Sequence, residues 1–186
     1  MLFATAEKYA SYQPELFETV KHHLMSIIVV LVKGLVSDQL AFIRIARKFI
    51  NIFDLKEVRA HRIGRGKIGG KAAGMILAFN ILDRPEPEDE IDLSRYVALP
   101  ETHFIGSDVY YDFKAINNFE RFTSQKYLTR EEIERQYPRI RKAYLAGKFP
   151  KDITEKLARL LKQIGKAPIS FCSSSFLEDN FVSAVA

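Results

Sequence analysis

The chain has 186 residues, of which 47% are hydrophobic and 27% are charged. This composition excludes a disordered chain and is typical of one soluble domain with room for a helical extension. A single cysteine, Cys172, excludes an internal disulfide and makes a reducing cytoplasm the expected location. The net charge of +5 fits a phosphate-bearing partner, although many basic proteins bind no nucleic acid.

Neither a signal peptide nor a membrane span is predicted. The start of the chain lacks a basic segment followed by an apolar core. The most apolar run, residues 27–32, is ended by Lys33 and Gly34. It is far shorter than the roughly 20 residues that a membrane helix requires.

Two amphipathic helices are predicted near the N-terminus. Apolar residues recur in steps of three and four over residues 15–36, which indicates the first helix. Ser37 is the expected N-cap of a second helix that runs to about Phe53. The basic face of the second helix could contact a membrane or a nucleic acid, but a solvated face over a packed stripe is preferred.

Residues 61–82 (HRIGRGKIGGKAAGMILAFNIL) place glycines and cations directly before an apolar run at helical spacing. Glycine lets the backbone approach an anion closely, and a helix N-terminus adds N–H groups and partial positive charge. Lys71 adds a full charge beside Gly69 and Gly70. The stretch therefore predicts a phosphate-binding loop, with a flexible glycine hinge as the alternative that the pattern leaves open.

Two well-known nucleotide motifs are excluded here. Gly64, Gly66 and Gly69 satisfy the spacing of the dinucleotide fingerprint, but residues 56–62 do not read as the buried strand that must precede it. The P-loop also fails, because Gly70 stands where that motif requires lysine, and no hydroxyl residue follows Lys71.

The next segments predict a loop, a strand and a helix. Residues 84–92 combine prolines with carboxylates, which predicts an exposed acidic loop. Residues 96–105 predict a short strand that is interrupted at Pro100. Ser107 or Asp108 then caps a predicted helix over 109–117, whose aromatic residues are expected in the core.

The last third of the chain contains further start and stop signals. Thr129 and Glu132 form a predicted capping box, and Pro138 is expected to break or kink the helix that follows, giving two short pieces before Gly147. Residues 150–165 predict a helix that ends at a glycine. Residues 168–172 predict a short strand in which Cys172 is buried, followed by polar turn residues.

Four blocks of this sequence resemble the N-terminal nucleotide-binding domain of the phosphoenolpyruvate synthase and pyruvate phosphate dikinase family. They are RIGRGKIGGKAAGM (62–75), LPETHFIGSDVYYDF (99–113), YPRIRKAYLAGKFP (137–150) and APISFCSSSFLEDNF (167–181), and the resemblance covers roughly residues 35–186. It implies an ATP-grasp type fold, ATP with Mg²⁺ as the ligands, and contact between Lys71 and the nucleotide phosphates. In complete enzymes of this family, ATP phosphorylates a histidine on a separate domain, which passes the phosphoryl group to pyruvate.

Two departures from the family pattern weaken the expectation of a complete, active ATP-binding domain. Cys172 stands where the family motif has an arginine that binds phosphate, and a thiol cannot offer the fork of donors of a guanidinium. A family glycine is also expected at Val182. The second lobe, the acidic metal ligands and the phosphohistidine and pyruvate-binding domains would all follow Ala186, so we expect a truncated domain that is inactive alone.

The resulting prediction is an α+β chain, with a helical region over 1–57 and the first part of an ATP-binding domain over 58–186. Whether the chain is an enzyme stays open; a non-catalytic remnant or interaction module with weak phosphate binding is the alternative, and nucleic-acid binding is disfavoured. Pyruvate or phosphoenolpyruvate is expected as a partner only in a full-length family member. No catalytic residue and no metal ligand are predicted, and the candidate nucleotide-binding residues are Lys71, Gly69, Gly70, Ser173 and Ser174.

Overall fold

The computed structural model describes residues 1–84 and 93–174. Packing divides the chain into two units, residues 1–106 with the segment that starts at residue 169, and residues 107–168. The domain boundary expected after residue 57 stays a prediction. Two expectations lie outside the described residues: most of the acidic loop 84–92, and the family glycine expected at Val182.

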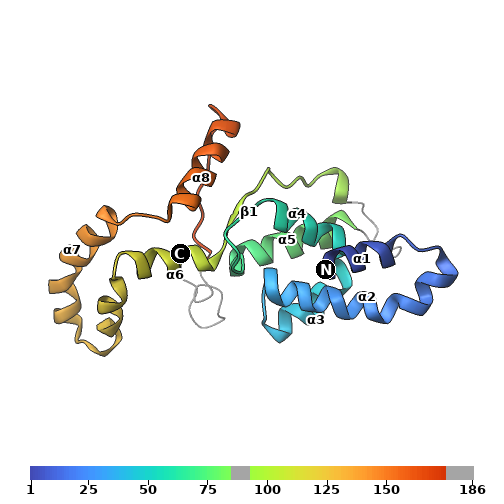
Figure 1. Cartoon of the computed structure of the whole chain (residues 1–186), viewed down its shortest axis with the longest axis horizontal. Coiled ribbons are helices and arrows are strands. Elements are labelled where there is room, and N and C mark those ends of the chain that lie inside the picture. The colour runs from blue at the N-terminus through green and yellow to red at the C-terminus, as the bar shows by residue number, and fades with distance from the viewer. Residues whose placement is uncertain (85–92, 175–186) are drawn as a thin grey trace. The chain divides into compact units, whose positions relative to one another are not determined.

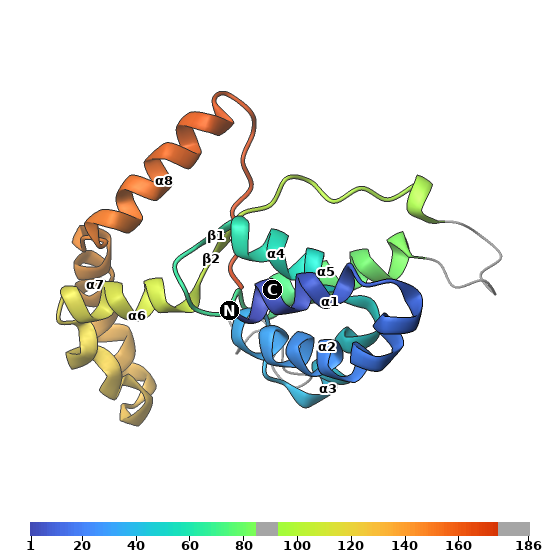
Figure 2. The ribbon, with the colours of Figure 1, turned by 45° about the vertical axis from the view of Figure 1, so that its right-hand side comes forward.

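Four helices make up residues 1–60 of the first unit (Figure 1, Figure 2). They are α1 (Leu2–Ala10), α2 (Pro14–Leu35), α3 (Leu40–Phe49) and α4 (Ile52–Ala60). The long helix α2 confirms the prediction for residues 15–36, and it contacts α1, α3 and α4. Its buried side chains hold it in the core, each contributing about 1.5–3 kcal/mol: Leu24, Ile28, Leu31, Val32 and Leu35.

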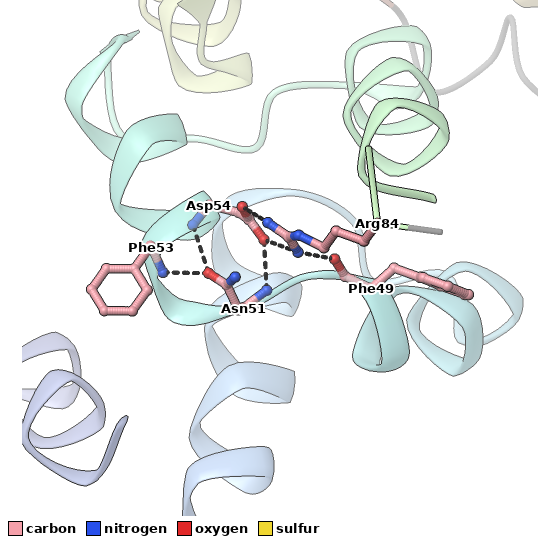
Figure 3. Close-up of polar contacts among 5 residues, drawn as sticks. All are labelled: Phe49, Asn51, Phe53, Asp54 and Arg84. Atoms are coloured by element: carbon pink, nitrogen blue, oxygen red, sulfur yellow. Dashed lines mark hydrogen bonds and ion pairs between the residues drawn. The ribbon is translucent and has the colours of Figure 1, made fainter. Parts of the chain in front are cut away.

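The single helix predicted from Ser37 to Phe53 is wrong, because a break separates α3 from α4. Asn51 stops the first helix and caps the second. Its side chain accepts hydrogen bonds from the N–H groups of Phe53 and Asp54 at 2.8 and 3.1 Å, and Asp54 accepts the N–H of Asn51 at 2.7 Å (Figure 3). This reciprocal capping box satisfies backbone donors that a continuous helix would have bonded internally.

The start of the second helix also differs from the prediction. The N-cap residue of α3 is Gln39 rather than Ser37, and its side chain makes no capping hydrogen bond. Ser37 is buried, and its hydroxyl accepts the N–H of Gln39 at 3.3 Å. It therefore shapes the turn before the helix instead of capping the helix itself.

Arg84, at the end of α5 (Gly70–Asp83), ties that helix to the break between α3 and α4. Its guanidinium donates to both carboxylate oxygens of Asp54, at 3.0 and 2.6 Å, and to the carbonyl oxygen of Phe49 at 2.6 Å (Figure 3). The hydrogen bonds to Asp54 raise the pKa of Arg84 above its ordinary value. The carboxylate of Asp54 thus takes part in the capping box of α4 and also holds the end of α5 in place.

Two short parallel strands flank α5 in sequence. β1 (Arg62–Ile63) pairs with β2 (Phe104–Ile105), with Arg62 opposite Phe104. Only the end of the strand predicted over 96–105 forms, because β1 offers partners to these two residues alone. The described residues are therefore mostly helical with a two-stranded sheet, which agrees with an α+β class.

The second unit contains α6 (Ser107–Ile116), α7 (Arg130–Ala146) and α8 (Lys151–Ile164), as well as the 3-10 helix η2 (Phe119–Tyr127). Its centre is aromatic: Phe113 lies 4.5 Å from Phe149, and Phe119 lies 4.5 Å from Tyr144, between ring centroids. The core role predicted for the aromatic residues of α6 holds for Phe113, whereas Tyr110 and Tyr111 are exposed.

The start and stop signals of α7 and α8 are largely confirmed. Thr129 and Glu132 form the predicted capping box, and α8 ends at Gly165, which has a φ of 68°. The division of α7 at Pro138 is wrong, because the helix runs through the proline. No residue of α7 is buried, so water can bond the carbonyl that the proline leaves without a backbone donor.

The strand predicted over residues 168–172 is also wrong. A strand needs a hydrogen-bonded neighbour, and within residues 1–84 and 93–174 the strands that pair are β1 and β2. Phe171 and Cys172 are exposed, so the expectation of a buried thiol fails with the strand.

Candidate functional site

The predicted phosphate loop lies between β1 and α5. The helix begins at Gly70, and Gly69 is its N-cap, with φ 84° and ψ 168°. That combination of angles is accessible in practice only to glycine. The local sequence therefore produces the predicted arrangement of a glycine turn that leads into a helix N-terminus, with Lys71 in the first helical turn.

Two contacts attach this loop to the turn between α2 and α3. The N–H of Ile68 donates to the carbonyl oxygen of Leu35 at 3.1 Å, and the Ile68 side chain is buried. The Lys67 ammonium pairs with Asp38. The hydrogen bond from Lys67 lowers the pKa of Asp38 below its ordinary value. The loop is therefore held on the helical N-terminal region.

Ser174 lies against the start of α5, although the two segments are far apart in sequence. Its hydroxyl accepts the N–H of Ala72 at 3.1 Å. A β-carbon added at Gly69 would collide with the carbonyl oxygen of Ser174 and lie 2.6 Å from its hydroxyl. A residue with a side chain at position 69 would thus push this segment away from the helix.

The candidate residues occupy distinct positions around this helix start. Gly69 and Gly70 form the turn, the Lys71 side chain is exposed beside them, and Ser174 bonds the first turn. Ser173 is exposed in the segment that carries Ser174. Four of the five candidates are therefore grouped at the start of α5, and their role in binding a nucleotide stays a prediction.

A hollow of about 350 Å³ opens beside Lys71. One wall comes from α5, and the other comes from the turn before α3 and from the first residues of that helix. Sequence reasoning missed the second wall, because the contact of α3 with α5 is tertiary and leaves no local signal. The lining residues are Ser37, Gln39, Phe42, Gly70, Lys71, Ala73, Gly74 and Met75.

The described residues contain neither a metal-ion cluster nor a membrane-spanning helix. Within residues 1–84 and 93–174, no three or more histidine, cysteine, aspartate or glutamate side chains group in a way that could hold a metal ion. None of the helices described combines the length and apolarity needed to cross a membrane.

One comparison with known proteins matches the part of the chain that contains the start of α5. A family model described as "Pyruvate phosphate dikinase, AMP/ATP-binding domain" matches residues 65–186. Its match includes Gly69, Gly70, Lys71, Ser173 and Ser174. The search of curated proteins and the search of solved structures each found no match.

Proposed function

The chain belongs to the family of the pyruvate phosphate dikinase AMP/ATP-binding domain, and on that premise we propose that it binds ATP at the start of α5. The observation that carries the proposal is the position of Lys71, directly after two glycines at the N-terminus of a helix. This helix start lies inside the segment that the family model matches.

The physical argument concerns the phosphates. The first N–H groups of a helix have no carbonyl acceptor within that helix, and the helix dipole adds partial positive charge. In α5 the N–H of Ala72 is bonded to the hydroxyl of Ser174, so the phosphates are expected at the N–H groups that precede it. Gly70 lacks a side chain that would keep an anion away from the backbone, whereas the space where Gly69 would carry a side chain is taken by Ser174. The exposed ammonium of Lys71 adds one full positive charge, which offsets part of the negative charge of a triphosphate.

The proposal extends to Mg²⁺ in a limited form. Mg²⁺ usually retains several water ligands and binds through substrate phosphates together with one or two carboxylates. The described residues provide no cluster of three or more ligands for it. We therefore propose that Mg²⁺ enters with the nucleotide, held by its phosphate oxygens.

The fold and the reaction are proposed more broadly, from family membership. An ATP-grasp architecture is the arrangement expected around this helix, and ATP would supply the phosphoryl group that the family transfers. Such transfer depends mainly on positioning and on neutralising charge. Lys71 contributes to the second of these requirements. The activity that we propose is therefore nucleotide binding, and transfer toward pyruvate stays an expectation.

Cys172 limits the expected affinity. It is exposed in the segment that carries Ser174, at the position where the family resemblance expects an arginine. A guanidinium donates two parallel hydrogen bonds to a phosphate, and a thiol does not. We therefore expect weak binding, and stronger binding in the Cys172→Arg variant.

The test is calorimetric titration of the whole chain with ATP and Mg²⁺. Lys71→Ala should weaken binding by about tenfold or more, the effect of losing one charge-assisted contact. Lys48→Ala is the matched control, because it removes an exposed lysine charge from α3 and should leave the affinity unchanged. Equal affinity of the wild type and Lys71→Ala, or no ATP binding by the wild type and Cys172→Arg, would reject the proposal.

A further inference from the structure

The hollow beside Lys71 has a wall that the family match does not include. Ser37, Gln39 and Phe42 line it from the turn before α3 and the start of that helix. The family model begins at residue 65, so its match does not extend to these three residues. They face residues of α5 that begin at Gly70, the position where the proposed phosphate site starts.

This wall is firmly attached to the proposed phosphate site. Leu35, just before the turn, accepts the backbone N–H of Ile68, and Asp38 within the turn pairs with Lys67. In α3 itself, Ile43 and Ala46 are buried in the core. Because both walls belong to one packed unit, the hollow is present before any ligand arrives.

The chemistry of the lining fits a flat ligand with a polar edge. Phe42 and Met75 offer apolar surface, and the carboxamide of Gln39 both donates and accepts hydrogen bonds. Ser37 is 3% exposed, and its hydroxyl oxygen accepts a bond from Gln39. No acceptor for the hydroxyl proton of Ser37 occurs among the described residues, so this group can donate to a ligand.

The charge of the lining and the volume of the hollow favour a nucleobase over a second phosphate group as its ligand. Lys71 is the charged member of the lining and stands at the end shared with the phosphate site. The volume of about 350 Å³ falls within the range of small-molecule sites, about 300–1,000 Å³. A phosphate would leave the aromatic and thioether surfaces uncovered, whereas a base can stack on them.

We propose that this hollow receives the nucleobase of the bound nucleotide, so that Phe42 and Gln39 of the N-terminal helical region determine which nucleotide binds. This inference rests on the proposed function, because the phosphates must occupy the start of α5. The triphosphate would contact Lys71 and the glycine turn, and the base would stack on Phe42 with its edge near Gln39.

The experiment compares ATP with inorganic triphosphate as ligands of the whole chain. Phe42→Leu keeps a large apolar side chain but removes the aromatic face, and Gln39→Ala removes the carboxamide. Each variant should weaken ATP binding by about fivefold or more while changing triphosphate binding less than about twofold. Lys71→Ala should weaken the binding of both ligands.

The chain offers a matched control for each variant. Phe49→Leu changes the other half-buried phenylalanine of α3, which does not line the hollow. Gln13→Ala changes another N-cap glutamine whose side chain makes no capping bond. Neither control should alter the affinity for ATP.

The possible outcomes separate the two proposals. If the wild type binds triphosphate as tightly as ATP, or if Phe42→Leu weakens both ligands equally, the base site is wrong and the phosphate site stands. If Phe42→Leu and Gln39→Ala leave ATP binding unchanged, the base site is also wrong. If neither ligand binds the wild type, the proposed function and this inference fail together.

Discussion

The hydroxyl of Ser174 accepts a hydrogen bond from the backbone N–H of Ala72 at 3.1 Å, across 102 positions of sequence. The carbonyl of Ser174 also approaches Gly69 so closely that no side chain fits there. These contacts bring two of the family's sequence blocks together at one helix start. A polar segment that carries Cys172 is thereby held beside the proposed phosphate site.

Replacing Gly69 by alanine should disrupt this contact. The angles of Gly69 suit only glycine, and the added β-carbon would overlap Ser174. We expect Gly69→Ala to lower the free energy of unfolding by about 1–3 kcal/mol, the cost of a strained backbone position. Urea denaturation monitored by circular dichroism measures this change.

Gly74 is the matched control for this substitution. It lies within α5, and an added β-carbon there meets nothing within 4 Å. Gly74→Ala should therefore stabilise the chain by about 0.5–1 kcal/mol, because alanine favours a helix interior. Equal effects of the two substitutions would contradict the backbone geometry assigned to Gly69.

Removing the carboxylate of Asp54 should destabilise the first unit more than removing the cation of Arg84. Asp54 accepts bonds from both Asn51 and Arg84, so Asp54→Ala loses a helix cap and an ion pair. We expect a loss of about 2 kcal/mol for Asp54→Ala and about 1 kcal/mol for Arg84→Ala. Thermal unfolding of both variants and of the double variant measures the losses and the coupling.

Asp83→Ala is the control, because Asp83 is an exposed acid directly before Arg84. It should change stability by less than about 0.5 kcal/mol. The network would be refuted if Arg84→Ala were neutral, or if the losses of the two single variants simply added in the double variant, since residues in one network do not act independently.

The capping box of α7 should make that helix sensitive to acid. The N–H of Thr129, with its hydroxyl, lowers the pKa of Glu132 below the ordinary value of 4.5. Since the folded-state pKa is depressed, the stabilisation is fully present above pH 4.5 and is lost as the pH falls through the lowered pKa. Titration of the Glu132 carboxyl carbon by NMR should give a midpoint below 4.5.

Glu132→Gln separates the charge from the hydrogen bond, because glutamine also completes a capping box. This variant should retain the cap and lose its part of the pH dependence. A Glu132 midpoint at or above 4.5 would show that the capping contact is absent in solution.

Cys172 should react with a maleimide in the folded chain, because its side chain is exposed. It is the single cysteine, so the modified mass reports on one position. ATP should slow the labelling if the phosphates lie at the start of α5, near the segment that includes Ser174. If Cys172 reacted only after denaturant was added, its thiol would be buried in the folded chain. That result would contradict the exposed position of Cys172 and favour the buried strand predicted from the sequence.

Much of the helical structure is predictable because its signals are local. The apolar spacing of α2, the capping box at Thr129 and the glycine that ends α8 each lie within one element. The break at Asn51 also has a local signal, a capping pair with Asp54. The apolar spacing through this region predicts one continuous helix, and that prediction is wrong. The hydrogen bonds of the capping box at Asn51 favour a new helix start over continuation of the first helix.

Nonlocal features are less predictable. A strand over residues 168–172 requires a neighbour that the sequence does not reveal, and in the structure the segment contacts the start of α5 instead. The glycine turn and Lys71 were recognisable as a possible phosphate site from residue types alone. Ser37, Gln39 and Phe42 became candidates only when the packing of α3 beside α5 was known.

The most direct test of ATP binding at the start of α5 is to follow backbone amide resonances while ATP is added to the ¹⁵N-labelled chain. We predict that the largest shifts occur at Gly69, Gly70 and Lys71, and that Lys71→Ala moves the titration to higher ATP concentrations. Glycine amides resonate in a separate spectral region, which makes the first two easy to follow. Shifts confined to other parts of the chain, or no shifts at saturating ATP, would contradict the account.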